Sequence, residues 1–168
     1  MKIKSEDLLF HWVRAMGVKV IFSRLQPRLL GIADAGSMTI TLAQSIKDRP
    51  RQLRCILAEE VGHILFPPRP GHVRYHSTRF VELESTEQSN IKATVAQDER
   101  KALQWATSVL MPDVEFSRAQ ENGADTIGKL ADWFDVEPWF VMVKISYLRR
   151  KDRENGQRIK WRDIIKRG

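Results

Sequence analysis

Two glutamates and a histidine in the stretch ILAEEVGHILF, residues 56–66, have the types and spacing to hold a metal ion. Glu59 and His63 are four positions apart, and residues with that separation lie on one face of a helix with Cβ atoms about 5–6 Å apart. Glu60 projects at a different angle, where a carboxylate can act as a general base toward water. Since zinc accepts imidazole nitrogen and carboxylate oxygen, the stretch predicts a hydrolytic metal site.

A third ligand has to come from another element, and Glu99 is the best candidate. It stands at the start of ERKALQWATSVLMP, residues 99–112, a helix-like stretch whose end could pack against the first helix. The single cysteine, Cys55, lies eight positions before His63, about 12 Å along a helix, so both cannot bind one ion. We expect Cys55 to be a small buried hydrophobic residue.

Together the two stretches resemble the ImmA/IrrE family of metallopeptidases. Members of that family carry LAHELGH followed by E-x-x-A-x-x-F-A-x-x-L-L-M-P, and both motifs align in phase with this sequence over a resemblance that covers roughly residues 8–150. The matching positions are Leu57, Ala58, Glu60, Gly62 and His63 in the first motif, and Glu99, Ala102, Trp105 (in place of Phe), Ala106, Leu110, Met111 and Pro112 in the second.

The resemblance implies a small zincin-like α+β fold in which His63 and Glu99 bind zinc and Glu60 is the general base. It also implies a metal-dependent endopeptidase that cleaves one regulatory, repressor-type protein, encoded by a prophage or another mobile element. Characterised relatives cut a helix-turn-helix repressor and so derepress genes.

Glu59 is the departure from the family, because it replaces the first histidine of the motif. In one interpretation Glu59 is itself a ligand, and the carboxylate-rich set then also suits Mn²⁺ or Fe²⁺. In a second interpretation, His72 or His76 supplies the missing nitrogen. The alternative for each of them is a solvated histidine in a loop, with no role in the site. In a third, no metal binds and the protein is a binding module that keeps the fold. Tyr75 or His76 could instead stabilise the oxyanion of a hydrolytic reaction.

The sequence around these residues predicts the elements that position them, namely a three-stranded sheet packed on several helices. A helix from Ser5 should end at Gly17. Strands are expected at 18–22, 29–34 and 38–43, the last two joined as a hairpin by a turn that contains glycine.

The metal motif should lie on a helix with Asp48 as N-cap and Pro50 in its first turn. The helix should run to Phe66 before two prolines stop it. Gly62 costs about 1 kcal/mol relative to alanine in a helix interior, which indicates close packing at that position. The buried stripe of this helix is expected to contain Leu53, Ile56, Leu57, Ile64 and Leu65.

Beyond a substrate-side loop at 67–90, with at most a short strand at RFVEL, helices are expected at about 91–110 and 113–120. A pair follows, TIGKLADWF and EPWFVMVKISYL, broken at Asp135, with the spacing of a helix-turn-helix. The alternative function is therefore a catalytically inactive zincin-like or helix-turn-helix module that binds DNA or a repressor. However, the second helix begins with apolar residues where a reader of base edges would present polar ones.

The charge is concentrated at the end of the 168-residue chain. Residues 144–168 contain 10 Lys or Arg and 3 Asp or Glu, an excess of seven that equals the formal charge of the whole chain, +7. We predict one zincin-like domain over 1–150, with a helical subdomain at 124–150, and a basic tail at 151–168. The tail could hold an acidic protein or make weak DNA contacts, with dissociation constants of about 10⁻⁴–10⁻⁶ M.

Several classes of protein are excluded by composition. One cysteine allows neither an internal disulfide nor a cysteine-rich zinc site, which suits a reducing compartment. The first residues lack the apolar run of a signal peptide, and no later stretch approaches the roughly 20 apolar residues of a membrane span. We therefore expect a cytoplasmic protein that does not bind a membrane.

Overall fold

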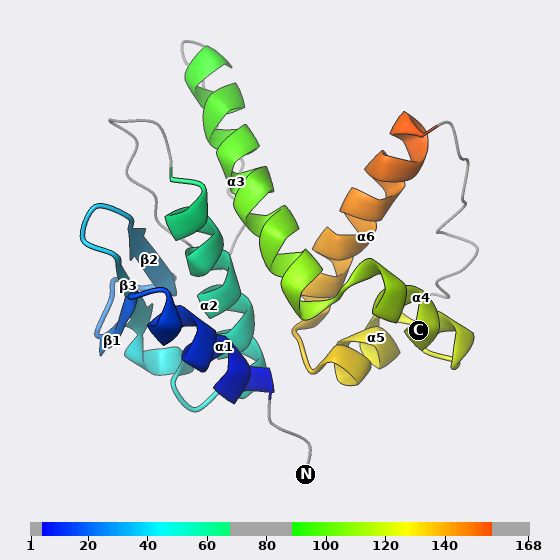
Figure 1. Ribbon diagram of the computed structural model, residues 1–168, viewed down its shortest axis with the longest axis horizontal. Helices are drawn as coiled ribbons and strands as arrows, with labels where there is room; N and C mark the ends of the chain where they lie inside the picture. Colours follow the sequence, from blue (N-terminus) through cyan, green and yellow to red (C-terminus); the bar gives the residue numbers. More distant parts are fainter. Residues whose placement is uncertain (1–4, 68–88, 156–168) are drawn as a thin grey trace. The chain divides into compact units, whose positions relative to one another are not determined.

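The computed structural model describes residues 5–67 and 89–155, and the chain divides into two compact units, Met1–Leu103 and Gln104–Gly168 (Figure 1). The boundary between the units falls within the helix α3 (Ser89–Leu110). Several predicted features lie outside the described residues: His72, Tyr75, His76, the short strand RFVEL, and the part of the basic tail from residue 156 onward.

Three strands form a mixed sheet in the first unit, in the order β1-β3-β2. β2 (Gly31–Asp34) and β3 (Thr39–Ala43) pair as an antiparallel hairpin, and β1 (Lys19–Ser23) runs parallel to β3. In the central strand, Ile40 and Leu42 are fully buried. The α+β prediction with a three-stranded sheet and a hairpin is confirmed.

The helix α1 (Ser5–Ala15) precedes the sheet and ends where the sequence predicts. Gly17 follows it with φ +76°, a left-handed conformation that glycine adopts at no steric cost. Because this residue turns the chain out of the helix, β1 can begin two positions later.

The helix α2 (Pro50–Leu65) carries the metal motif and packs against the sheet. Its N-cap is Arg49, so the prediction of Asp48 was wrong. The short turn η1 (Gln44–Ile46) precedes it, and the Arg49 amide donates to the Ile46 carbonyl at 3.0 Å, which extends the turn one residue further before the helix starts. Pro50 takes the first helical position, where the amide it lacks would have no partner in the helix.

Burial along α2 is nearly continuous. Every residue from Leu53 to Ile64 is buried, which confirms the predicted stripe except at Leu65. Leu65 is the last residue of the helix and is 41 % exposed. The acidic pair is therefore not the solvated face that a Glu-Glu dipeptide on a helix usually forms.

The second unit continues from the end of α3 with three further helices, α4 (Asp113–Glu121), α5 (Ile127–Phe134) and α6 (Pro138–Glu154). The Thr126 hydroxyl caps α5 by accepting the Lys129 amide at 3.2 Å, and Asp135 ends it with a left-handed φ of 53°. The predicted helix pair is confirmed, although α6 runs six residues past the expected end at 148.

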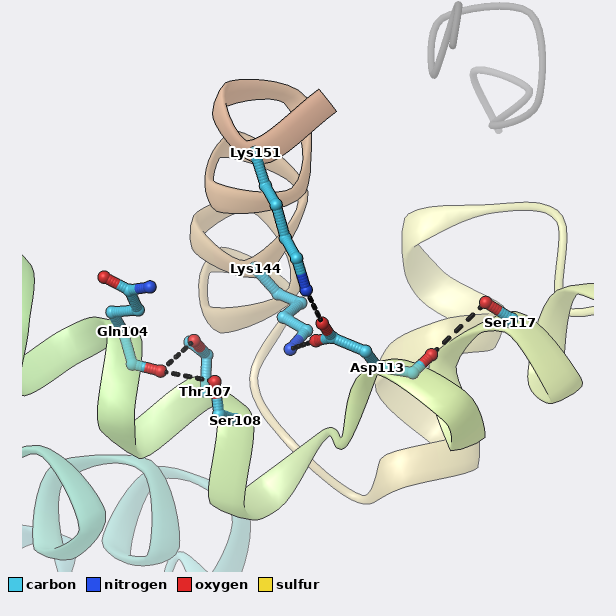
Figure 2. Close-up of polar contacts among 7 residues, drawn as sticks. All are labelled: Gln104, Thr107, Ser108, Asp113, Ser117, Lys144 and Lys151. Atoms are coloured by element: carbon cyan, nitrogen blue, oxygen red, sulfur yellow. Dashed lines mark hydrogen bonds and ion pairs between the residues drawn. The ribbon is translucent and has the colours of Figure 1, made fainter. Parts of the chain in front are cut away.

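Polar contacts in the second unit tie α6 to the start of α4 (Figure 2). The Lys144 ammonium, on a side chain only 2 % exposed, donates to Asp113 Oδ1 at 2.5 Å, and Lys151 Nζ donates to Oδ2 at 2.9 Å. Partial burial alone would raise the pKa of the Asp113 carboxyl, but the hydrogen bonds from the two lysines outweigh it and lower the pKa. Two basic residues of the charge-rich segment are thus engaged within the unit.

No helix in the described ranges has both the length and the apolar character needed to cross a bilayer.

Candidate metal centre

Three side chains that could ligate a metal converge in the first unit, Glu59 and His63 from α2 and Glu99 from α3. One ligand atom of each lies within 4.8 Å of the other two. Glu59 and His63 are 2 % and 4 % exposed, because they lie on the same face of a buried helix. Glu99 is partly exposed, at 29 % of its side chain. The structure therefore brings together the three residues predicted as ligands.

The separation between His63 and Glu99 matches the geometry of a shared ion. His63 Nε2 and Glu99 Oε2 are 3.4 Å apart. Two ligands that each lie about 2.0–2.1 Å from a tetrahedral zinc ion are separated by about 3.4 Å. These two atoms are thus already at the required spacing, and the ligand atom of Glu59 lies within 4.8 Å of both.

Glu99 reaches the group from inside α3, not from its start. The helix begins at Ser89, so Glu99 lies near its middle, and the predicted placement at a helix end was wrong. The carboxylate can still reach α2 because α3 passes close to α2 one turn further on, where the backbone of Ala102 lies against Gly62.

The close approach of the two helices depends on Gly62. A Cβ atom added at Gly62 would lie 2.6 Å from the Ala102 carbonyl oxygen and 2.8 Å from the Ala102 Cα. Both are backbone atoms, so neither can move aside without shifting α3. The expected close packing at Gly62 is confirmed, and it brings the side chains of the two helices within reach of one another.

Gly62→Ala is expected to separate α2 from α3 and weaken metal binding. Overpacking of this kind costs about 1–3 kcal/mol of unfolding free energy. Because the added methyl moves Glu99 away from His63, zinc affinity should fall about 10–100-fold, as it does when the support of a metal ligand is disturbed. Competition with a chromophoric chelator measures the affinity, and urea unfolding measures the stability.

Gly128→Ala is the matched control for this substitution. It makes the same chemical change in α5, where the nearest atom to the added Cβ is Thr126 Oγ1 at 4.0 Å. Its zinc affinity should equal that of the wild type. An unchanged affinity in Gly62→Ala would show that the helix contact does not hold the group together.

Glu60 is buried beside this group, but among the described residues it is not part of the three-residue set whose ligand atoms lie within 4.8 Å of one another. Its side chain, 1 % exposed, lies against Gly31 of β2. In the part of the chain that the structure describes, Glu60 Oε1 has no hydrogen-bond partner. A buried carboxylate next to a metal site, and outside its ligand set, is suited to accept a proton.

The electrostatics of the centre disfavour a metal-free, fully ionised state. Burial raises the pKa of Glu59 well above its ordinary value, and the charges of Glu60 and Glu99 raise it further. Burial also raises the pKa of Glu60 to about 8, with a further contribution from Glu99. A divalent cation would offset this repulsion and the cost of burying the carboxylates. The donor set of one imidazole and two carboxylates therefore fits a divalent ion such as zinc.

Metal-free protein is expected to lose stability as the pH rises from about 5 to about 8. Unfolded glutamates ionise near the ordinary pKa of 4.5, whereas folded Glu60 keeps its proton to about pH 8. The folded state thus binds more protons than the unfolded state in this window. The contribution of protonated Glu60 to the free energy of unfolding is complete below pH 4.5 and is lost as the pH rises through 8. A tenfold change in proton affinity is worth about 1.4 kcal/mol, so we expect a loss of about 3–5 kcal/mol.

Urea unfolding in the presence of chelator at several pH values measures this loss. Glu60→Gln should make the dependence shallower, because its amide does not titrate while Glu59 still does, and zinc should restore the stability of the wild type near pH 8. Parallel curves for the wild type and Glu60→Gln would contradict the raised pKa.

Cys55 is fully buried, as expected for a small hydrophobic residue. The contact between Gly31 and Glu60 was not predicted, although a glycine inside the strand-like stretch LLGIAD is a signal for close approach of another group.

The sequence matches no protein-family model and no curated protein.

Proposed function

We propose that the protein is a metal-dependent endopeptidase of the ImmA/IrrE type. Glu59, His63 and Glu99 would hold the ion, and Glu60 would be the general base. The observation that carries this proposal is the convergence of three ligand atoms within 4.8 Å in a buried site, with a third carboxyl group, that of Glu60, buried beside them. The two aligned motifs support the same reading, and they suggest a repressor-type protein of a prophage or mobile element as the substrate.

A divalent ion in this centre would polarise the scissile carbonyl and acidify the attacking water. Glu60 takes a proton from that water and later returns it to the leaving amine, since the same carboxyl group can act as base and then as acid. Positive charge near Glu60 offsets the repulsion from Glu99 that contributes to its raised pKa, so its carboxylate form becomes accessible at neutral pH. Burial excludes bulk water and keeps the proton transfer local.

The test is metal-dependent cleavage of a defined substrate. Protein stripped with chelator and protein reloaded with zinc are each incubated with a panel of purified helix-turn-helix repressor proteins, and the products are identified by mass spectrometry. We expect one cleaved bond in the reloaded sample, none after chelation, and recovery when zinc is added back. Protein that binds no zinc, manganese or iron would contradict the proposal.

A second candidate function is DNA binding by a metal-free module. The observation that favours it is the turn between α5 and α6, where Asp135 adopts the left-handed conformation that a tight helix-turn-helix needs. Against it, Phe140, Val141 and Val143 of α6 are buried. In addition, Lys144 and Lys151 are engaged with Asp113. A shift of operator DNA by metal-free protein in a gel, without cleavage of the repressor, would favour this candidate.

A further inference from the structure

We infer that Gly31 is a positioning residue for Glu60. The backbone of β2 at Gly31 supports the Glu60 side chain, and any side chain at position 31 would push the carboxyl group away from the metal centre. This inference rests on the proposed function, because a position for Glu60 matters to catalysis only if Glu60 is the general base.

The contact is defined by three atoms of one side chain. A Cβ added at Gly31 would overlap Glu60 Oε1 and would lie 2.8 Å from both Cγ and Cδ of Glu60. Contacts under 3.0 Å are essentially never made by real Cβ atoms. The outer half of the Glu60 side chain therefore occupies the space that a side chain at position 31 would need.

Backbone conformation does not explain the glycine. The positive-φ glycines in the described residues are Gly17 and Gly123, and Gly31 pairs with Leu42 as an ordinary strand residue. Glycine weakens a strand because it contributes no side chain to the packing. Its presence at the start of β2 is accounted for by the space that Glu60 needs.

The same contact limits where the Glu60 carboxyl group can go. A glutamate has three side-chain torsions and would otherwise adopt several conformations. Here the side chain is 1 % exposed, rests on the β2 backbone, and lies near enough to Glu99 for their charges to interact. A base held in this way is positioned before the substrate arrives, which saves the cost of ordering it during the reaction.

A double-mutant cycle tests the contact without any substrate. Gly31→Ala, Glu60→Ala and the double variant are compared with the wild type by thermal unfolding in chelator. Gly31→Ala should lower the Tm of the wild type by about 3–10 °C. In the Glu60→Ala background it should lower the Tm by less than about 2 °C, because Cγ, Cδ and Oε1 are gone. An equal fall in both backgrounds, or no fall in either, would overturn the inference.

Gly36→Ala is the matched control in the same hairpin. The nearest atom to its added Cβ is Asp34 Oδ1, at 3.3 Å, and Glu60 is not among its neighbours within 4 Å. Its effect on the Tm should be the same with Glu60 or alanine at position 60. A coupling to Glu60 as large as that of Gly31→Ala would overturn the inference, since the effect would then not be specific to the contact.

A second measurement separates positioning from general structural damage. Gly31→Ala should bind zinc with the affinity of the wild type, because the added methyl faces Glu60 and none of the three ligands is among the nearest atoms. Cleavage of the repressor that the wild type cuts should fall about 100-fold or more, as for loss of a general base. Equal loss of zinc affinity and cleavage, or full cleavage, would overturn the inference. If the wild type cleaves nothing, the proposed function fails, while the thermal cycle still decides whether Gly31 supports Glu60.

Discussion

Glu60→Gln is expected to bind zinc as tightly as the wild type and to lose about 10²–10⁴-fold in the rate of peptide cleavage. The amide has nearly the shape of the carboxylate but cannot take a proton from water. Because Glu60 lies outside the three-residue ligand set, its replacement should leave the ligands in place. Zinc stoichiometry by elemental analysis and single-turnover cleavage of the repressor measure the two effects.

Glu121→Gln is a suitable control for this variant, since it makes the same chemical change at an exposed position of α4. It should retain both zinc and cleavage. Two results would argue against Glu60 as the base. One is a Glu60→Gln protein that cleaves at the wild-type rate, and the other is a protein that has lost its zinc together with its activity.

Glu59→Ala is expected to lower zinc affinity by more than about 100-fold, a loss as large as that of His63→Ala. Removal of an outer-shell partner of a metal ligand already costs about 10–100-fold, and a direct ligand should cost more. Glu59→His should keep binding, because imidazole is a zinc ligand and this change restores the first histidine of the family motif. Competition titrations with a chromophoric chelator compare the four proteins.

This experiment also separates the three interpretations of the Glu59 position. If Glu59→Ala binds zinc like the wild type while His72→Ala or His76→Ala does not, a loop histidine supplies the missing nitrogen. If no protein in the series binds a metal, the binding-module interpretation gains. Asp98→Asn, next to Glu99 on α3, is the control for a nonspecific effect of lost negative charge, and its affinity should not change.

A metal ion held by Glu59 would compete with the proton for the carboxyl oxygens of that residue, and its charge would also disfavour the protonated form of Glu60. Burial keeps Glu59 and Glu60 protonated in the metal-free chain at pH values where exposed glutamates are ionised. A cation favours the ionised forms, so metal binding should release protons and should be weaker at low pH. The loss of metal-free stability with rising pH and its reversal by zinc have this common origin.

Much of the local structure followed from the sequence. The helical repeat places Glu59 and His63 on one face of α2, and the alternation and turn residues of 29–43 predict the β2-β3 hairpin. Gly17 and Asp135 mark the ends of α1 and α5. These features depend on residues within a few positions of one another, and such short-range preferences can be read from residue spacing.

Contacts between distant segments were decided only by the tertiary structure. The parallel pairing of β1 with β3, the approach of Glu99 to His63, and the packing of Gly62 on Ala102 each join residues that are far apart in the chain. The support of Glu60 by Gly31 is of the same kind. The sequence by itself determined which residue types could form a metal site and which helix face carries two of them. Whether they meet depends on how closely two helices and a strand pack, which is set by the shape of the whole core and not by local spacing.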